Sequence, residues 1–439
     1  MSTSGMRGAG PAAGAVNERS GVRWRIFLLM LALVSINYVD RASLSVAMPL
    51  ISEEFGIGPA FQGVLLSCFF WTYALMQIPG GWLADRFGPR SVIAAATVGW
   101  GAFQALAAGA FSAGWLLLMR LGLGATEGPI YPSGGKLNAV WMPPKERGRG
   151  AVILDGGAPL GTAIGGIIIA GLIGAFGSWR IAFIIAGVGT IAAGIFAYWY
   201  IRNSPREHRS VNDAEASYIE AEHAREDEQT LPTQAGRHSV LNYLRFRSFW
   251  GMGLGWFGFN LVFYGLVTWA PTYLAETRGL SIGQIGGATF FIFGAGFVGE
   301  LIGGYAADFW RERGGAPNVV MRTVLGVAGV FTTLSIFLVA FVGSAFAAVA
   351  LLASTLFFLR WAGLYWSIPS ILTDRSRAGV LGGMMNFMGN IAGITVPILI
   401  GVIVQVTGSY FLGLMFFAFA GLLFLASSLS IDYSRKLPV

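Results

Sequence analysis

The stretch GWLADRFGPR, residues 81–90, returns in a weaker form as GYAADFWR, residues 304–311. The first stretch closes an apolar run at residues 61–84, and the second closes another at residues 283–308, 223 residues further along the chain. The same loop therefore stands at the same position in each half of the sequence. A duplication of this kind predicts two similar helical bundles that pack around a central cavity.

The composition of the 439 residues excludes a water-soluble globule. Hydrophobic residues make up 55% and charged residues only 12%, and the mean hydropathy is +0.64; soluble domains carry about 25% charged residues. We therefore expect an all-α membrane protein with twelve transmembrane helices in two pseudo-symmetric six-helix bundles. The predicted spans cover residues 24–50, 61–84, 91–110, 114–140, 150–174, 179–201, 248–274, 283–308, 321–342, 346–371, 379–404 and 409–430.

These spans divide the chain into five parts. We expect a flexible tail at 1–22, a six-helix bundle at 23–201, a connector at 202–247, a second six-helix bundle at 248–430 and a short tail at 431–439. Of the 29 lysines and arginines, 23 fall on the side of the tails and the connector, and two fall on the other side. The positive-inside rule then predicts that both termini and the connector are cytoplasmic.

The loop at residues 81–90 suggests a gating contact. Asp85 lies at the cytoplasmic end of its span, where it can pair with Arg86, Arg90 or a basic residue of the next segment such as Arg147. Such a contact would hold the cytoplasmic side shut. The alternative is a positive-inside cluster without a gating role, and this alternative weighs more for the weaker copy around Asp308.

Charged residues inside the predicted spans each cost about 2.5–3.5 kcal/mol on insertion scales, so each needs a partner or a function. Arg120 and Glu127 are seven residues apart, which puts them on nearly one helix face with about 10 Å of rise between them, along one wall of a cavity. Asp40 and Arg41 point about 100° apart, so one faces the cavity and the other a neighbouring helix. The full set is Asp40, Arg41, Arg120, Glu127, Asp155, Glu300 and Arg360, with Lys136 near a span end.

Polar residues form inward stripes beside these charges. Asn37 shares a helix face with Arg41, and similar pairs occur at Tyr73 with Gln77 and at Asn386 with Asn390. Two readings stay open for any single amide, which either contacts a substrate or only bonds one helix to another.

Four stretches of the chain resemble one family. They are INYVDRASLS at 36–45, QIPGGWLADRFG at 77–88, RLGLGATEGPIYP at 120–132 and NFMGN at 386–390. Together they are similar to the anion:cation symporter family of the major facilitator superfamily, which includes bacterial hexuronate, aldarate and galactonate permeases, sialin and vesicular glutamate transporters.

The resemblance implies a role for each matching residue. Arg41 would hold the substrate carboxylate, Tyr73 would form a hydrogen bond with it, and Asn390 would be a polar contact from the opposite half; the helix-face stripes add Gln77 and Asn386 as candidate substrate contacts. Asp40 and Glu127 would be the protonatable pair, and Arg120 the cation that tunes them. The chemistry agrees, because arginine offers a permanently charged fork to a carboxylate and a desolvated carboxylate titrates nearer to the working pH.

Two positions depart from the family pattern. Where sugar-acid members carry amides early in the fifth span, this chain has Asp155. Arg360 lies deep in the tenth span, where it either binds a second substrate carboxylate or pairs with Glu300, which is the favoured alternative.

We therefore expect a proton-coupled symporter of a bacterial inner membrane that imports a small organic anion, a sugar acid first of all, by alternating access. Its expected partners are that anion, protons and membrane lipid; we expect no cofactor, metal or nucleic acid, and a monomer. The alternatives are an importer of another mono- or dicarboxylate, a major facilitator proton antiporter for drugs or metabolites, or a sensor that keeps the fold without transport. An enzyme is the remotest option, because the single cysteine, Cys68, is in an apolar run, the three histidines lie in the connector, and no nucleotide-binding loop occurs.

Overall fold

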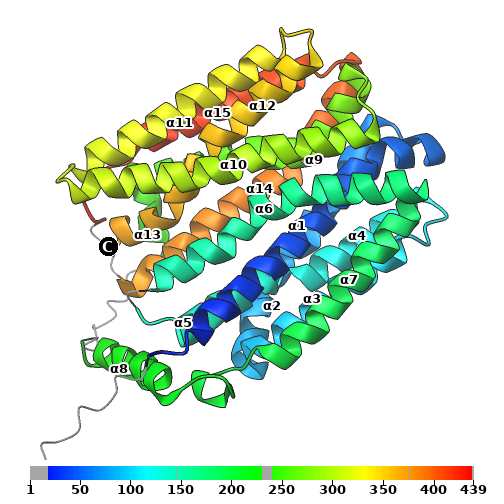
Figure 1. The fold of residues 1–439 in the computed structure, drawn as a ribbon. Helices are drawn as coiled ribbons and strands as arrows, with labels where there is room; N and C mark the ends of the chain where they lie inside the picture. Colours follow the sequence, from blue (N-terminus) through cyan, green and yellow to red (C-terminus); the bar gives the residue numbers. More distant parts are fainter. Residues whose placement is uncertain (1–17, 145, 230–239, 374, 438–439) are drawn as a thin grey trace, which may run out of the picture.

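The computed structural model describes residues 18–144, 146–229, 240–373 and 375–437. Helices make up the first half of this part of the chain, and the turns between them are short (Figure 1). Their bounds are α1 (Val22–Phe55), α2 (Pro59–Phe87), α3 (Pro89–Ala107), α4 (Ala113–Glu127), α5 (Ile130–Trp141), α6 (Arg147–Phe176) and α7 (Trp179–Tyr200).

The second half repeats the pattern after a connector. The connector holds η1 (Pro205–Glu207), α8 (Asp213–Gln229) and η2 (Val240–Arg245). The second half consists of α9 (Arg247–Arg278), α10 (Ile282–Glu312), α11 (Pro317–Val339), α12 (Ala345–Leu359), η3 (Arg360–Ser367), α13 (Ile368–Leu372), α14 (Arg375–Thr407) and α15 (Phe411–Ser430).

Twelve membrane crossings account for these helices. Within the described residues, ten segments are long and apolar enough to span a bilayer by themselves, with α12, η3 and α13 counted as one. The other two crossings are α3 and the pair α4 and α5. The expected all-helical fold of two six-helix halves is confirmed.

The fourth span is broken, where the sequence predicts a continuous helix at 114–140. α4 ends at Glu127 and α5 begins at Ile130, because Pro129 cannot donate the backbone hydrogen bond that a continuous helix needs. Gly128 lets α2 come close, since a Cβ there would lie 2.8 Å from Met76 Cβ and 2.9 Å from the Tyr73 carbonyl oxygen. The break places the Glu127 carboxylate at the end of a helix in the middle of the protein.

The tenth span is also interrupted, where the sequence predicts one helix at 346–371. Its α-helical part ends at Leu359, and residues Arg360–Ser367 continue as a 3₁₀-helix. A stretch of this kind inside a span often marks a functional position. Here it begins at the intramembrane arginine.

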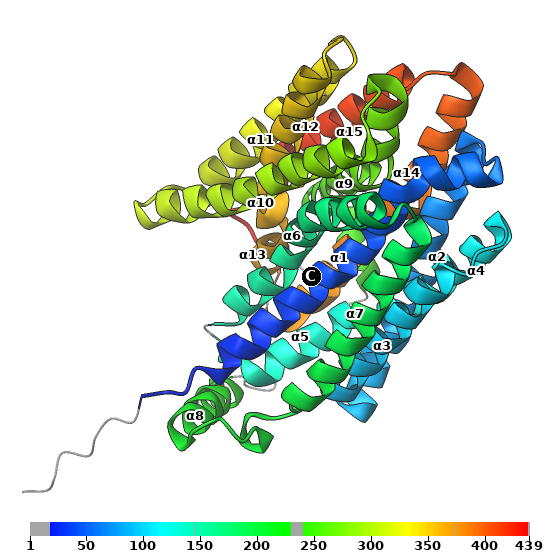
Figure 2. The ribbon, with the colours of Figure 1, turned by 45° about the vertical axis from the view of Figure 1, so that its right-hand side comes forward.

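Among the described residues, the main contacts between the two halves are those of α6 with α10, α2 with α14 and α1 with α9, and α1 also touches α10. α6 lies against α10 in both views of the ribbon (Figure 2). At the end away from α8, the halves are tightly closed, because a Cβ at Gly63 would lie 2.4 Å from the Pro397 carbonyl oxygen and one at Gly166 would lie 3.2 Å from that of Gly286. We call this the closed end, and the end that carries α8 the connector end.

Toward the connector end the halves part. Gly383 lies fourteen residues before Pro397 on α14, so the two share a helix face. A Cβ at Gly383 would meet nothing within 4 Å, whereas Pro397 touches α2. The interface between the halves therefore has one closed end.

The connector helix α8 binds the beginning of α1, beside the connector end (Figure 1). Glu215 accepts hydrogen bonds from the backbone N–H of Val22 at 3.0 Å and from Arg23 Nη1 at 2.7 Å, and it also contacts the Ser20 hydroxyl. It thereby caps a helix whose own N-cap residue, Gly21, has no side chain to do so. The predicted tail at 1–22 is thus held in place from Glu18 onward, and residues 1–17 lie outside the described part of the chain.

Candidate functional site

An ion pair between Arg41 and Glu127 forms the centre of the first half. Arg41 Nε donates to Glu127 Oε1 at 2.5 Å, and Arg41 Nη2 contacts the same oxygen. The arginine side chain is 4% exposed and the glutamate is fully buried. A close pair compensates both charges in the low-dielectric interior.

Aromatic rings enclose this guanidinium. The Arg41 Cζ atom lies 4.5 Å from the Tyr38 ring centroid, 4.6 Å from that of Phe69 and 4.7 Å from that of Tyr73. Ring faces attract a cation and leave its edge free to bind carboxylates. Tyr73 is therefore beside Arg41, as the resemblance implies.

Asp40 turns away from its neighbour. Its Oδ2 accepts hydrogen bonds from Trp100 Nε1 of α3 at 3.1 Å and from Thr190 Oγ1 of α7 at 2.8 Å, and its Oδ1 has no hydrogen-bond partner. The divergence expected from the 100° step of the helix is thus present. Among the described residues, no hydrogen bond or ion pair joins Asp40 to Glu127, so the two acids occupy separate environments.

Arg120 is buried beside this pair and forms no ion pair within 4 Å among the described residues, although Glu127 and Asp40 interact with it electrostatically. It is 5% exposed, and its Nε and Nη1 make no hydrogen bond. Its Cζ lies 5.3 Å from the centroid of Phe69, a ring that also contacts Arg41. A fixed positive charge left unpaired inside a membrane protein is costly and marks a binding position.

Both arginines line one small pocket between the halves. The first half contributes the arginines and most of the rings, and α9 of the second half contributes Tyr264, Val267 and Thr268. Tyr264 packs against Phe70 with ring centroids 4.7 Å apart and ring planes tilted by 60°. The cavity thus has a cationic wall and an aromatic wall, a combination suited to a small anion with a carbon skeleton.

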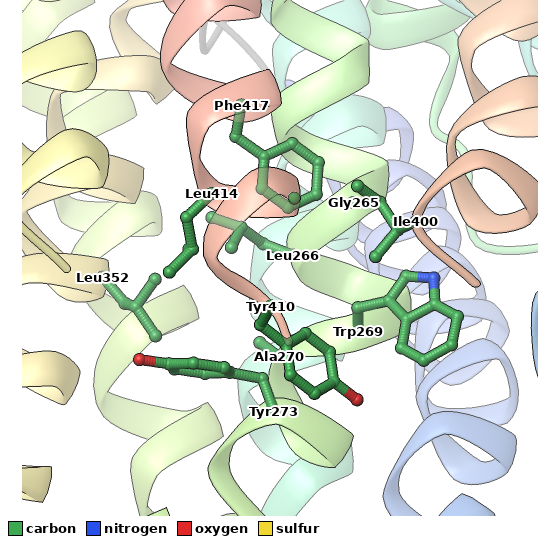
Figure 3. A pocket seen from close by; sticks show the side chains of 11 residues that line it. Gly265, Leu266, Trp269, Ala270, Tyr273, Leu352, Ile400, Tyr410, Leu414 and Phe417 are labelled. Atoms are coloured by element: carbon green, nitrogen blue, oxygen red, sulfur yellow. The ribbon is translucent and has the colours of Figure 1, made fainter. Parts of the chain in front are cut away.

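A second small pocket lies within the second half and has a different lining (Figure 3). Its walls are leucine, isoleucine and aromatic rings from α9, α12, α14 and α15, including Leu266, Trp269 and Phe417. No charged side chain lines it. It is therefore no candidate for an anion.

The polar residues predicted as substrate contacts on α2 and α14 are partly or fully buried. Gln77 and Asn386 are half-buried, and Asn390 is 7% exposed. The Asn390 amide donates to the Asn386 carbonyl oxygen of its own helix at 3.1 Å. In this conformation, these residues line α2 and α14 without a contact to Arg41 among the interactions described.

Arg360 forms a second charged centre. Its Nη2 lies 2.5 Å from Glu300 Oε2 of α10 and 3.4 Å from Asp155 Oδ2 of α6. The expected pairing with Glu300 is confirmed. The contact with Asp155, on the opposite half, was not expected from the sequence.

The gating contact predicted for Asp85 has a different partner. Asp85 Oδ1 pairs with Lys136 Nζ of α5 at 2.7 Å, and not with Arg86, Arg90 or Arg147. Arg147 instead pairs with Glu226 of α8 at 2.8 Å, while Arg90 Nε donates to the Tyr198 carbonyl oxygen at 2.8 Å and Arg86 lies over the Trp82 ring. Asp85 pairs with Lys136 and not with the arginines because α5, which carries Lys136, lies beside α2 at the connector end.

Sequence reasoning missed several residues of the site. Trp100 and Thr190, which hold Asp40, carry no signal that separates them from packing residues, and Tyr38 carries only its place one turn before Arg41. Lys136 was visible as a charge near a span end, and its spacing from Glu127 along the fourth span could have placed it at the connector end.

Twelve crossings in two similar halves, with buried arginines around a central cavity, define a multi-pass membrane transporter. A family model, the Major Facilitator Superfamily, matches residues 30–397. The chain belongs to this superfamily, and thus to a family of transporters and not of enzymes.

The relatives are bacterial transporters of the kind that the four motif stretches resemble. The chain is 30% identical over 403 residues to the probable galactarate/D-glucarate transporter GudP of Bacillus subtilis, covering 90% of this chain and 88% of that one. It is 33% identical over 401 residues to the probable sulfoacetate transporter SauU of Cupriavidus necator, with 91% of each chain covered. It is 32% identical over 391 residues to a hexuronate transporter of Bacillus subtilis, with 88% of each covered.

The fold is also that of a solved structure. A bacterial homologue of the human lysosomal transporter Spinster, in an inward-facing and unoccupied conformation, matches with a TM-score of 0.75 at 19% identity. The match covers 95% of this chain and 99% of that one.

Proposed function

We propose that this chain is a proton-coupled symporter that imports a small organic anion, in the first place a sugar acid, across a bacterial inner membrane. The observation that carries the proposal is Arg120, a buried guanidinium with two unpaired nitrogens in the same cavity as Arg41. A substrate carboxylate supplies the missing negative charge there. The relatives named for galactarate, D-glucarate and hexuronate support the class of substrate.

The Arg41–Glu127 pair provides the coupling. Arg41 cannot bind a substrate carboxylate with two parallel hydrogen bonds while it is paired with Glu127. A substrate carboxylate therefore competes with the glutamate for the guanidinium. Protonation of Glu127 removes that competition and frees Arg41. Binding of the anion and of a proton thus favour each other, which is the requirement for symport.

Asp40 is the second proton carrier of the proposal. Asp40 makes no ion pair among the described residues, and an ionised carboxylate is costly in the membrane interior. Asp40 therefore carries a proton, while Trp100 and Thr190 donate hydrogen bonds to it and Arg120 interacts with it electrostatically. An anion that enters a negative-inside cell is opposed by about 2.3 kcal/mol per charge per 100 mV. A monoanion therefore needs two protons to be drawn in by the membrane potential.

The conformation fits one step of alternating access. With both termini and the connector in the cytoplasm, the closed end is periplasmic and the structure faces inward. In the opposite conformation Asp85 would hold the cytoplasmic side shut. In this conformation it gives up that contact and pairs with Lys136. The transporter acts as a monomer, because each chain contains a complete cavity.

The test is uptake by proteoliposomes under an imposed pH gradient, with D-glucarate, D-glucuronate and sulfoacetate as substrates. Glu127→Gln should lose gradient-driven accumulation but retain exchange of labelled substrate across the membrane, because a neutral side chain mimics the protonated state. Glu53→Gln, an exposed carboxylate of the same half, is the control. Loss of exchange and accumulation alike would argue against the role of Glu127, and preferential binding of a lipophilic cation would favour drug antiport.

A further inference from the structure

Asp155, Arg360 and Glu300 form a charged centre between the two halves. Both carboxylates approach the same nitrogen, Arg360 Nη2, with Glu300 Oε2 at 2.5 Å and Asp155 Oδ2 at 3.4 Å. Arg360 and Glu300 belong to the second half, and Asp155 belongs to the first. The exposed fraction of the side chain is 4% for Arg360, 12% for Glu300 and 20% for Asp155. Asp155 is therefore the most accessible member of the centre.

The accessible part of Asp155 faces the space between the halves. Asp155 lies eleven residues before Gly166 on α6, on the connector side of the tight contact between Gly166 and α10, where the halves part. Its carboxylate interacts electrostatically with Tyr38 of α1, Tyr131 of α5 and Tyr264 of α9. Because these phenols come from both halves, they place Asp155 in the interior of the protein and not on its lipid face.

Two of the same tyrosines connect Asp155 with the anion pocket. Tyr38 and Tyr264 line the pocket of Arg41 and Arg120, and each interacts electrostatically with Arg41 as well as with Asp155. The Arg41 Cζ atom lies 4.5 Å from the Tyr38 ring centroid. A substrate with its carboxylate at the arginines can therefore extend its carbon chain past these rings toward Asp155.

The charge balance of the centre favours an uncharged ligand group. Two ionised carboxylates and one guanidinium leave one negative charge, which is costly at this depth, so the two acids hold one proton between them. A second substrate carboxylate would make the neutral centre negative again, and an ammonium group would enter only in exchange for the proton. A hydroxyl group brings no charge and fits the centre as it stands.

Hydroxyl groups of a substrate need an acceptor that the arginines do not supply. A guanidinium only donates hydrogen bonds, whereas the two oxygens of a carboxyl group offer about four acceptor positions. Glu127 is already held by Arg41, and Arg360 contacts only one oxygen of Asp155. Asp155 is therefore the carboxyl group beside the pocket that can accept hydrogen bonds from a ligand.

We infer that Asp155 is a specificity-determining residue, which accepts hydrogen bonds from hydroxyl groups on the carbon chain of the substrate. Arg360 and Glu300 position it for this contact. The inference rests on the proposed function and deepens it, because such a site selects a polyhydroxy acid over an acid of the same length without hydroxyls. When the connector end closes, the halves approach each other around Asp155 and enclose this part of the substrate.

The experiment compares D-glucarate with adipate, which has the same carbon chain and both carboxylates but no hydroxyl groups. Calorimetry on the purified protein gives a Kd for each ligand, and the ratio of the two is the preference for hydroxyls. Wild type should prefer D-glucarate. Asp155→Ala should reduce this preference by about threefold to tenfold, because at least one hydrogen bond is lost. Asp155→Asn, whose amide oxygen still accepts, should keep a larger part of it.

The control is Glu300→Gln, which disturbs the same ion-pair centre but leaves the acceptor at Asp155 in place, so its preference should remain that of wild type. A purely structural defect weakens both ligands alike and leaves the ratio unchanged. Asp155→Leu, which has a similar volume and no acceptor, provides the same test if Asp155→Ala does not fold.

Two results overturn the inference alone. They are equal affinities of wild type for D-glucarate and adipate, and an unchanged preference in Asp155→Ala or Asp155→Leu. Wild-type protein that binds neither ligand overturns the proposed sugar-acid substrate itself, and the inference with it. The failure of the proposed function is thus distinguishable from the failure of the role of Asp155.

Discussion

Asp40 and Arg41 are adjacent in α1, yet their side chains belong to different parts of the protein. Arg41 pairs with Glu127 in the central cavity, whereas Asp40 accepts hydrogen bonds from Trp100 and Thr190 between α3 and α7. The helix turns by about 100° per residue, which is enough to point the two side chains into different helix interfaces. In the proposed mechanism, the substrate contact and the proton site are therefore one peptide bond apart.

This separation predicts that Asp40→Asn weakens the coupling of substrate transport to protons without loss of substrate binding. The amide oxygen can accept from Trp100 and Thr190 as the carboxylate does, so the variant should fold and bind D-glucarate as wild type does. With the membrane potential held at zero, accumulation should fall tenfold per pH unit, because one proton is lost. Binding is measured by calorimetry. A binding defect as large as that of Arg41→Gln would mean that Asp40 acts on the substrate.

The two arginines of the cavity predict opposite effects on stability. Arg41→Gln leaves Glu127 buried without its cation, which costs about 3–5 kcal/mol. Arg120→Gln removes a buried charge whose Nε and Nη1 make no hydrogen bond, so the unfolding temperature should stay the same or rise. Both variants should bind D-glucarate about tenfold or more weakly, because each loses charged hydrogen bonds.

Thermal unfolding with and without D-glucarate separates these effects. The ligand should raise the unfolding temperature of wild type and have little effect on either variant. Arg322→Gln, in the second half and bonded only to the backbone oxygen of Ile431 in the interactions described, is the control for loss of an arginine. A large destabilisation by Arg120→Gln would indicate that Arg120 has a structural partner in solution.

The fold was predictable because hydropathy and duplication act along the chain. Span length and the repeated loop predict the twelve crossings, and the cost of buried charge singles out the residues around which the cavity forms. What the sequence could not supply is the rotation and depth of each helix. Arg41 meets a residue 86 positions away, and Asp155 meets one 205 positions away, through packing that no local pattern encodes.

The same limit explains the errors. The pattern at 114–140 is apolar enough for one helix, and the break at Gly128 and Pro129 is visible only as a proline within it. Asp85 has several arginines nearby in sequence, but α5 brings Lys136 to it in space. Electrostatic partners in this protein are decided by which helices are neighbours.

The cap of α1 predicts a dependence of stability on pH. Burial raises the pKa of Glu215, but hydrogen bonds from Ser20, Arg23 and the Val22 N–H outweigh this effect and hold the pKa below its usual value of about 4.3. The unfolded protein therefore binds a proton before the folded one does. The stabilisation is complete above pH 5 and is lost as the pH falls through the folded pKa.

Glu215→Gln should lower the free energy of unfolding by about 3 kcal/mol at pH 7, because Arg23 loses one of its buried partners. The difference from wild type should shrink below about pH 4, where wild type becomes protonated too. Unfolding in detergent between pH 3 and 7 measures both. Glu220→Gln, whose carboxylate pairs with Arg206 at the surface, should leave the unfolding temperature nearly unchanged.

The exchange proposed for Asp85 predicts opposite effects from the two members of one ion pair. In this conformation Asp85 is bound to Lys136. In the proposed mechanism, Asp85 instead holds the connector end shut in the opposite conformation. Asp85→Asn should therefore favour opening of the connector end, whereas Lys136→Met frees Asp85 and should favour closure. Because the pair is exposed and worth up to about 1 kcal/mol, each population should shift by roughly two- to fivefold.

A cysteine at position 383 reports this equilibrium. Gly383 faces open space at the connector end, and Cys68→Ser removes the single native cysteine. Maleimide labelling of Gly383→Cys should be faster with Asp85→Asn and slower with Lys136→Met than in the same background without either change. Labelling rates in both variants that equal the rate of the background would mean that the Asp85–Lys136 pair belongs to a positive-inside cluster without a gating role. A shift in the same direction for both would mean that the ion pair itself, and not its exchange, sets the equilibrium.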